Sequence, residues 1–184
     1  MGWLILVMVI ILQWNARSLL ANGQEFKHFI NKTDVKPGVI CVQETWLKPT
    51  LDFVIQGYTN VRKDRDHGGG GGCATFIRKD IPYRVLGKGK DQEYIVVEVW
   101  ESGEKCVIIN YYNPCKRLDL DSLLSIGENR QKVIWCADFN AHSTTWGGSY
   151  TDVNGKVIEE LMEERDLVCL NNGAGTRINI TTGD

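Results

Sequence analysis

Short apolar segments recur along the chain, and they constrain its fold more than any other feature of the sequence. Each is four to seven residues long, the length of a strand rather than a helix. They occupy residues 39–42, 73–77, 94–100, 106–112 and 133–137. Continuous apolar runs of this length are typical of strands buried on both faces. The pattern therefore predicts stacked sheets, with a hairpin where residues 101–104 join two of the segments.

Helical spacing of apolar residues appears in three places only. Phe26, Phe29 and Ile30 fall on one face after Asn22-Gly23, and two similar patterns follow at residues 120–124 and 157–162. Residues 167–170 are apolar again and predict a last strand. Strands outnumber helices, so we expect an α/β or α+β fold in which helices cover the sheets.

Length and composition exclude several other classes. With 184 residues, 43% of them hydrophobic, we expect a single domain over residues 1–184 rather than a disordered chain or a coiled coil. The net charge of −2 excludes a uniformly basic nucleic-acid coat, but it is compatible with a nucleic-acid enzyme. The six cysteines form no C-x-x-C pair, which favours free thiols and an intracellular location.

The apolar run at residues 3–12 has two readings. No Lys or Arg precedes it, and it continues directly into Gln13-Trp14-Asn15. It is too short to span a bilayer as a helix. We therefore expect a buried first strand and no stable membrane association, with a signal or membrane anchor as the alternative.

Polar clusters follow three of the apolar segments at their carboxyl ends. Asn15 ends the first, residues 43–46 end the second, and residues 138–142 end the third. Sites collect where strand ends meet at one side of a layered sheet. We expect these clusters to form one convergent site.

The residue types in these clusters suit magnesium-assisted phosphate hydrolysis. Mg²⁺ takes oxygen ligands and usually has one or two protein carboxylates, so Glu44 is a candidate ligand. Asn15 is a second candidate for the metal site, since its amide oxygen can bind the ion directly or through a water. Asp138 is placed to orient or deprotonate a water, and Asn140 to hold that water or a phosphate oxygen. Each residue alone is equally compatible with a turn, a cap or a surface charge. Their shared placement favours the site.

Several ordered motifs resemble those of the endonuclease/exonuclease/phosphatase superfamily, and in particular the apurinic-endonuclease-like domain of non-LTR (LINE-type) retrotransposons. The motifs are Trp14-Asn15-Ala16-Arg17-Ser18, Gln43-Glu44-Thr45-Trp46-Leu47, Arg62-Lys63-Asp64-Arg65 before the glycine run, Tyr112-Asn113-Pro114, Asp138-Phe139-Asn140-Ala141-His142 and the continuation of the last to Gly147.

This resemblance implies a four-layer α/β/β/α sandwich that cuts phosphodiester bonds with Mg²⁺ or Mn²⁺. Glu44 matches the metal-ligand glutamate and Asn15 the asparagine beside it. Tyr112 matches a tyrosine that contacts the scissile phosphate. Asp138 matches the aspartate that activates water, with Asn140 as its partner. The expected activity is DNA nicking in the nucleus, in a protein with a reverse transcriptase downstream.

Basic and aromatic side chains in the same loops are candidates to contact DNA. They are Arg17, Arg62, Arg65, Trp46, His142 and Trp146.

Two departures from the family pattern matter. Ala137 stands where the family usually has glycine. Two later motifs, Ser-x-x-Asp and Ser-Asp-His, find no match before Asp184, so we expect a domain that lacks C-terminal strands and has impaired activity. The alternatives are a phosphatase or phosphodiesterase that acts on small or lipid phosphate esters, and a non-catalytic remnant.

Overall fold

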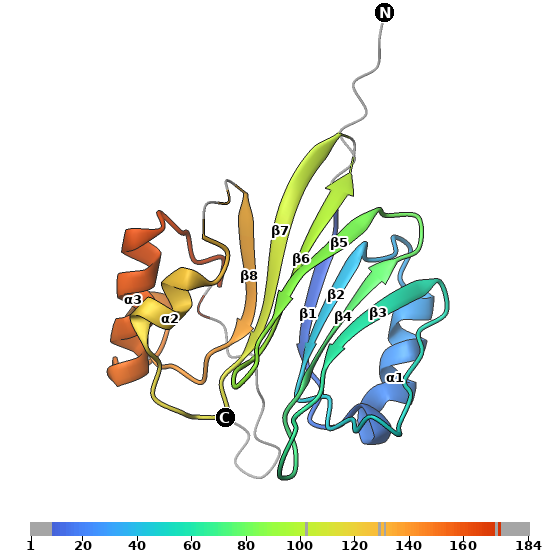
Figure 1. The fold of residues 1–184 in the computed structure, drawn as a ribbon, viewed down its shortest axis with the longest axis horizontal. Coiled ribbons are helices and arrows are strands. Elements are labelled where there is room, and N and C mark those ends of the chain that lie inside the picture. Colours follow the sequence, from blue (N-terminus) through green and yellow to red (C-terminus); the bar gives the residue numbers. More distant parts are fainter. Residues whose placement is uncertain (1–8, 102, 129, 131, 172, 174–184) are drawn as a thin grey trace, which may run out of the picture. The chain divides into compact units, whose positions relative to one another are not determined.

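The computed structural model describes residues 9–101, 103–128, 130, 132–171 and 173, which fall into two compact units. The first unit comprises the residues up to Pro114 together with Gly127–Phe139. The second comprises Cys115–Ile126 and the residues from Asn140 onward. Among the described residues, the strands and the first helix belong to the first unit, and the other helices belong to the second (Figure 1).

The strands of the first unit form two mixed sheets of four strands each. The first sheet has the order β1 (Ile11–Asn15), β2 (Val39–Gln43), β4 (Cys73–Arg78), β3 (Tyr58–Lys63). The second has the order β5 (Tyr83–Lys88), β6 (Glu93–Glu101), β7 (Glu104–Tyr112), β8 (Val133–Asp138). Strands β1 and β2 are parallel, as are β7 and β8, and all other neighbours are antiparallel. The predicted stacked sheets and the β6–β7 hairpin are confirmed.

A cluster of apolar side chains from both sheets fills the space between them. Strand residues alternate between two faces, so every second residue enters this layer. From the first sheet, Val39 and Cys41 of β2 and Ile77 of β4 take part; from the second sheet, Ile95 of β6 and Ile108 of β7 do. The intervening residues of the first sheet, such as Ile40 and Phe76, pack on its other face.

The inward-facing series changes from apolar to polar along each strand that leads to the predicted site. In β2, Val39 and Cys41 are followed by Gln43, and in β8, Ile134 and Cys136 are followed by Asp138. The same alternation brings Asn15 at the end of β1 and Tyr112 at the end of β7 into the inner layer. The polar residues therefore gather at one end of an otherwise apolar core.

Helix α1 (Leu19–Lys32) covers the face of the first sheet that is turned away from the second sheet (Figure 1). Asn22-Gly23 lies inside this helix rather than before it, because Ser18 caps the helix through a bond from Ala21 N. Gly23 is needed for close packing, since a Cβ there would lie 2.2 Å from Cε2 of Phe53.

The face of α1 was predicted only in part. Phe26 and Ile30 are buried, whereas Phe29 is 52% exposed and stacks on Phe26 from outside. The prediction that Phe29 lies on the core face is wrong. Phe26, one turn earlier in the helix, already fills the space over the sheet.

The first apolar run leads into the core at its described end. Val9 and Ile11 pack against the cluster between the sheets, and Leu12 packs under α1. Residues 3–8 lie outside the described residues. Within the part of the chain that the structure describes, no helix has the length and apolar character to cross a membrane.

Two strands, β3 and β5, were not predicted. Both lie at the edge of a sheet. Edge strands carry polar side chains because one side of the strand meets water, so Thr59, Asn60 and Arg62 interrupt the apolar pattern of β3.

The second unit consists of α2 (Leu120–Ser125), the 3₁₀ turn η1 (Thr144–Trp146) and α3 (Val153–Glu164). Asn154 links the two helical segments: its Oδ1 accepts from Leu118 N at 2.9 Å, and its Nδ2 donates to Lys116 O. Asp152 caps α3 through Gly155 N.

The predicted strand at residues 167–170 does not form. Val168 and Leu170 are 80% and 87% exposed, and the segment pairs with no strand among the described residues. An apolar segment becomes a strand only when a neighbouring strand accepts its backbone hydrogen bonds.

Tyr111 lies in an aromatic cluster on the outer face of the second sheet. Its ring is 5.4 Å from that of Phe139, 6.1 Å from Trp135 and 6.2 Å from Tyr94. Burial, with the nearby Tyr94, raises the pKa of Tyr111 from 10.0 to about 12. The folded state therefore favours the neutral phenol.

This burial predicts a loss of stability at high pH. Since unfolded Tyr111 ionises near pH 10 and folded Tyr111 near pH 12, its contribution is complete below pH 10 and is lost as the pH rises to 12. The loss amounts to about 3 kcal/mol of unfolding free energy. Urea unfolding of Tyr111→Phe should show a correspondingly weaker pH dependence over this range. Tyr150→Phe, at an exposed position, should match the wild type, and equal slopes for all three proteins would contradict the prediction.

Candidate active site

The side-chain amide of Asn15 joins two carboxylates that come from different sheets. Its Nδ2 donates to Glu44 Oε1 at 2.8 Å and to Asp138 Oδ2 at 2.7 Å. Its Oδ1 accepts from the backbone N of Arg17 at 3.2 Å. The structure thus brings together three of the predicted site residues, although Glu44 and Asp138 lie 29 and 123 positions after Asn15 in the chain.

The backbone around Glu44 is held in an unusual conformation. Glu44 and Trp46 have backbone φ angles of 50° and 54°, values that residues other than glycine rarely adopt. Neighbouring segments fix this conformation through backbone bonds, among them Ser18 N to Glu44 O at 2.9 Å and Trp46 N to Gly71 O at 2.9 Å. In this conformation the Glu44 carboxylate lies within hydrogen-bond distance of the Asn15 amide.

Tyr112 completes the polar group within the first unit. Its phenol lies near the carboxylates of Glu44 and Asp138, whose charges act on it. Burial raises the pKa of Tyr112 well above its usual value, and the charges of Glu44 and Asp138 raise it further, while Arg65 lowers it. The phenol is therefore neutral over the physiological range and acts as a hydrogen-bond donor.

A buried pair of amides lies beneath the site. Gln43 donates from Nε2 to Asn110 Oδ1 at 2.8 Å and to Cys136 O at 3.1 Å. Asn110 in turn donates to Ala74 O and to Thr75 Oγ1. Gln43, Asn110 and Thr75 are fully buried. Because these bonds connect both sheets one residue from Glu44, they fix the spacing at the floor of the site.

Sequence reasoning missed Asn110. A signal was present, since Asn110 interrupts the apolar strand Cys106–Tyr112 at an inward-facing position. A polar residue at such a position needs a partner in the core, which is the fully buried Gln43.

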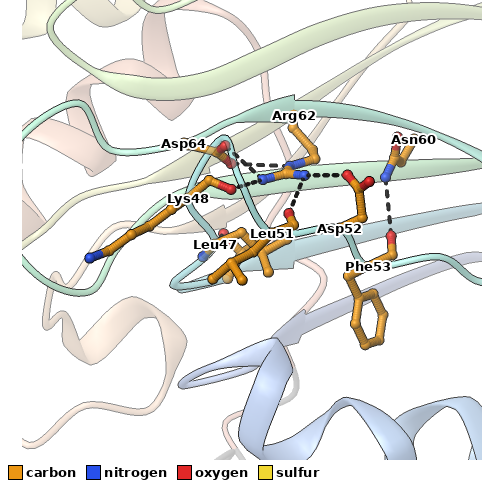
Figure 2. Close-up of polar contacts among 9 residues, drawn as sticks. Leu47, Lys48, Leu51, Asp52, Phe53, Asn60, Arg62 and Asp64 are labelled. Carbon is orange, nitrogen blue, oxygen red and sulfur yellow. Dashed lines mark hydrogen bonds and ion pairs between the residues drawn. The ribbon is translucent and has the colours of Figure 1, made fainter.

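Arg62 was expected to contact DNA, and the structure shows it engaged within the protein (Figure 2). Its guanidinium donates to Leu51 O at 2.8 Å and to Lys48 O at 3.0 Å, and it forms an ion pair with Asp64 at 2.7 Å. Asp52 lies 3.5 Å away. We infer that Arg62 holds the loop that follows Trp46; its predicted contact with DNA stays a prediction.

Arg65 is also engaged within the protein. Its Nε donates to Glu93 Oε1 at 2.6 Å. Arg17 and Trp46, by contrast, are exposed, and both follow the strand ends that carry Asn15 and Glu44. These two side chains remain candidates to contact a substrate.

Asn140, His142 and Trp146 belong to the second unit. Asn140 is exposed and has a φ angle of 46°. His142 stacks on Tyr150 with a centroid distance of 5.2 Å, and Trp146 Nε1 donates to Ala141 O at 3.3 Å. The structure describes these residues within their own unit only, so their predicted roles stay predictions.

The donor set of the first unit fits a hard cation. No group of three or more His, Cys, Asp or Glu side chains is arranged to hold a metal ion in the described residues. Mg²⁺ needs only one or two carboxylates, which Glu44 and Asp138 supply. The Asn15 amide orients the carboxylates through its Nδ2, while its oxygen accepts from Arg17 N; its predicted role as a metal ligand stays a prediction.

Two packed mixed sheets with a carboxylate pair and an amide at their strand ends define a class of α/β sandwich with an acidic site. The chain belongs to the Endonuclease/Exonuclease/phosphatase family, whose sequence model matches residues 12–183. The resemblance found in the motifs is thereby confirmed.

Solved structures share the fold at low sequence identity. The endonuclease domain of TRAS1, a telomere-specific non-LTR retrotransposon, has a TM-score of 0.75 and 20% identity, over 96% of this chain and 80% of that one. An AP endonuclease from Archaeoglobus fulgidus has a TM-score of 0.56 and 18% identity, over 85% of this chain and 71% of that one. The predicted two-sheet fold is confirmed by these similarities.

Among curated proteins, the chain is similar to the RNA-directed DNA polymerase from mobile element jockey of Drosophila melanogaster. The two are 25% identical over 168 residues, which cover 89% of this chain and 18% of that protein. The Drosophila funebris protein of the same name is 22% identical over 170 residues, with the same coverage. The chain therefore spans about a fifth of the length of these relatives.

The contacts of Arg62 predict the behaviour of the loop at residues 48–53. Lysine cannot reproduce a planar fork that reaches two carbonyls and a carboxylate, so Arg62→Lys should free this loop. We expect about 1–2 kcal/mol lower stability. Amides of residues 50–53 should exchange roughly tenfold faster, in keeping with that free-energy loss.

A matched control is Arg78→Lys. Arg78 forms a comparable fork to Asp80 and to Lys36 O, away from the loop. This variant should leave exchange at residues 50–53 unchanged. Equal exchange in wild type and Arg62→Lys would show that Arg62 does not hold the loop.

Proposed function

We propose that this domain hydrolyses phosphodiester bonds and nicks DNA with the help of a divalent metal ion. The observation that carries the proposal is the Asn15 amide, which holds the carboxylates of Glu44 and Asp138 together at 2.8 and 2.7 Å. Two carboxylates so close repel each other in the ionised state, and an amide N–H group or a cation between them relieves the repulsion. Such a pair suits a hard cation and an attacking water.

Each site residue of the first unit has a distinct role in this proposal. Asp138 orients the attacking water and accepts its proton, while Asn15 fixes the carboxylate that does so. Tyr112, kept neutral by burial, donates a hydrogen bond to an oxygen of the scissile phosphate. Glu44 would hold Mg²⁺ or Mn²⁺, which when bound neutralises negative charge on the phosphate.

The similarities support DNA as the substrate. The fold is shared with the endonuclease domain of a non-LTR retrotransposon, and the curated relatives are RNA-directed DNA polymerases of mobile elements. We propose that the chain acts beside a reverse transcriptase in the nucleus, and that the nick it makes supplies the 3′-hydroxyl from which that enzyme starts.

A nicking assay tests the proposal directly. The purified chain, in excess over supercoiled plasmid because impaired turnover is expected, should produce open circles with Mg²⁺ and none with EDTA. Asp138→Asn should slow nicking by about 10²- to 10⁴-fold, since an amide cannot accept the proton of water. Glu44→Gln should also slow it, but higher Mg²⁺ should restore part of the rate, because this variant weakens metal binding.

The matched controls are Asp91→Asn and Glu25→Gln, which make the same chemical changes at exposed positions. Both should nick at the wild-type rate. Release of phosphate from small or lipid esters without nicking would favour the phosphatase alternative. Absence of both activities would leave a non-catalytic remnant and contradict the proposal.

A further inference from the structure

The backbone conformation of the glycine run at residues 68–72 is determined by the side chains that pack against it. Gly70, Gly71 and Gly72 all have positive φ angles, of 72°, 65° and 85°. A Cβ at Gly71 would lie 2.2 Å from Nη2 of Arg65, and one at Gly72 would lie 2.7 Å from Thr45 Oγ1. Glycine is therefore required at both positions, for conformation and for space.

Backbone bonds tie this run to the loop that carries Glu44. Thr45 N donates to Gly72 O at 3.2 Å, and Trp46 N donates to Gly71 O at 2.9 Å. On its other side, Gly72 N donates to Glu93 Oε2. The run is thus fixed between the Glu44 loop and the first residue of β6.

The guanidinium of Arg65 is held at this junction. It donates to Glu93 Oε1 at 2.6 Å and, from Nη1, to Gly69 O at 2.8 Å. Both side chains are mostly buried, with 24% of Arg65 and 10% of Glu93 exposed. A buried ion pair in which both partners also have further hydrogen bonds is geometrically well defined.

Glu93 places this ion pair beside Tyr112. Glu93 and Tyr112 lie directly opposite each other in the β6–β7 ladder, and residues paired in this way have Cβ atoms about 4.5–5.5 Å apart. The guanidinium, held by Glu93, therefore lies near the phenol, and its positive charge lowers the pKa of Tyr112. A series of neighbouring side chains runs from Glu93 and Arg65 to Tyr112 and Glu44.

We propose that Arg65 is a positioning residue that orients the phenol of Tyr112 in the active site, and that the glycine run exists to present it. The inference rests on the proposed function and deepens it. Arg65 acts through Tyr112 and not by contact with a phosphate of the DNA. Arginine is required because its planar fork donates to Glu93 and to Gly69 O at once, which a lysine cannot do.

A double-mutant cycle distinguishes this role from a purely structural one. Arg65→Met should slow nicking roughly 10- to 100-fold, the usual cost of removing a group that orients a site residue. In a Tyr112→Phe background the same change should cost less than about threefold, because the group that Arg65 orients is already absent. Arg65→Lys should fall between wild type and Arg65→Met. Equal costs in the two backgrounds would overturn the inference.

The matched control is Arg84→Met. Arg84 also pairs with a buried carboxylate, Glu98, at 2.8 Å, but at the edge strand β5. This variant should nick at the wild-type rate. A loss equal to that of Arg65→Met would assign the effect to general destabilisation and overturn the inference.

A second measurement does not depend on activity. The chain has six tyrosines, and labelling with ¹³Cζ-tyrosine gives one resonance for each. The Tyr112 resonance, identified by its loss in Tyr112→Phe, should shift in Arg65→Met and not in Arg84→Met. If the wild type fails to nick, the proposed function fails, and this measurement alone decides the role of Arg65: an unmoved resonance overturns it.

Discussion

The hydrogen bonds of the Asn15 amide are the interaction on which the rest of the site depends. One NH₂ group serves both Glu44 and Asp138, so the ends of three strands must lie within hydrogen-bond reach of a single side chain. That requirement fixes the parallel register of β1 on β2, in which Asn15 pairs with Gln43. It also fixes the distance between the two sheets, since Asp138 ends a strand of the second sheet.

The polar residues around this interaction lie at the end of an apolar core, where hydrogen bonds offset the cost of burial. Gln43 Nε2 donates to Asn110 Oδ1 across the sheets, which holds the floor of the site rigid. Glu93 and Arg65 neutralise each other in its wall. The strained backbone at Glu44 is kept by bonds from its neighbours. These hydrogen bonds and the ion pair limit the movement of the carboxylates. This favours catalysis because the site needs little rearrangement during the reaction.

Charge in the sequence said little about what each arginine does. Arg17 and Arg65 follow strand ends, and Arg62 lies near the end of β3, all close in sequence to the site motifs. Arg62 binds backbone carbonyls and Asp64, and Arg65 binds Glu93, whereas Arg17 is exposed. Glu93 lies 28 positions from Arg65 in the sequence, and the two carbonyls that accept from Arg62 lie 11 and 14 positions from it. Only the folded chain brings these groups together. A guanidinium that donates to acceptors within the protein has fewer donors left for DNA, and local sequence does not reveal those acceptors.

The sequence by itself determined the strands with continuous apolar runs, the helices and the position of the polar residues at strand ends, because periodicity and turn residues act locally. It missed the edge strands β3 and β5, in which polar residues interrupt the apolar pattern, and it predicted a strand at residues 167–170 that has no partner among the described residues. Only the tertiary structure decided which side chains meet: Asn15 with two carboxylates, Gln43 with Asn110, and the glycine run with Arg65. These contacts depend on sheet spacing and on residues far apart in the chain, neither of which a local pattern encodes.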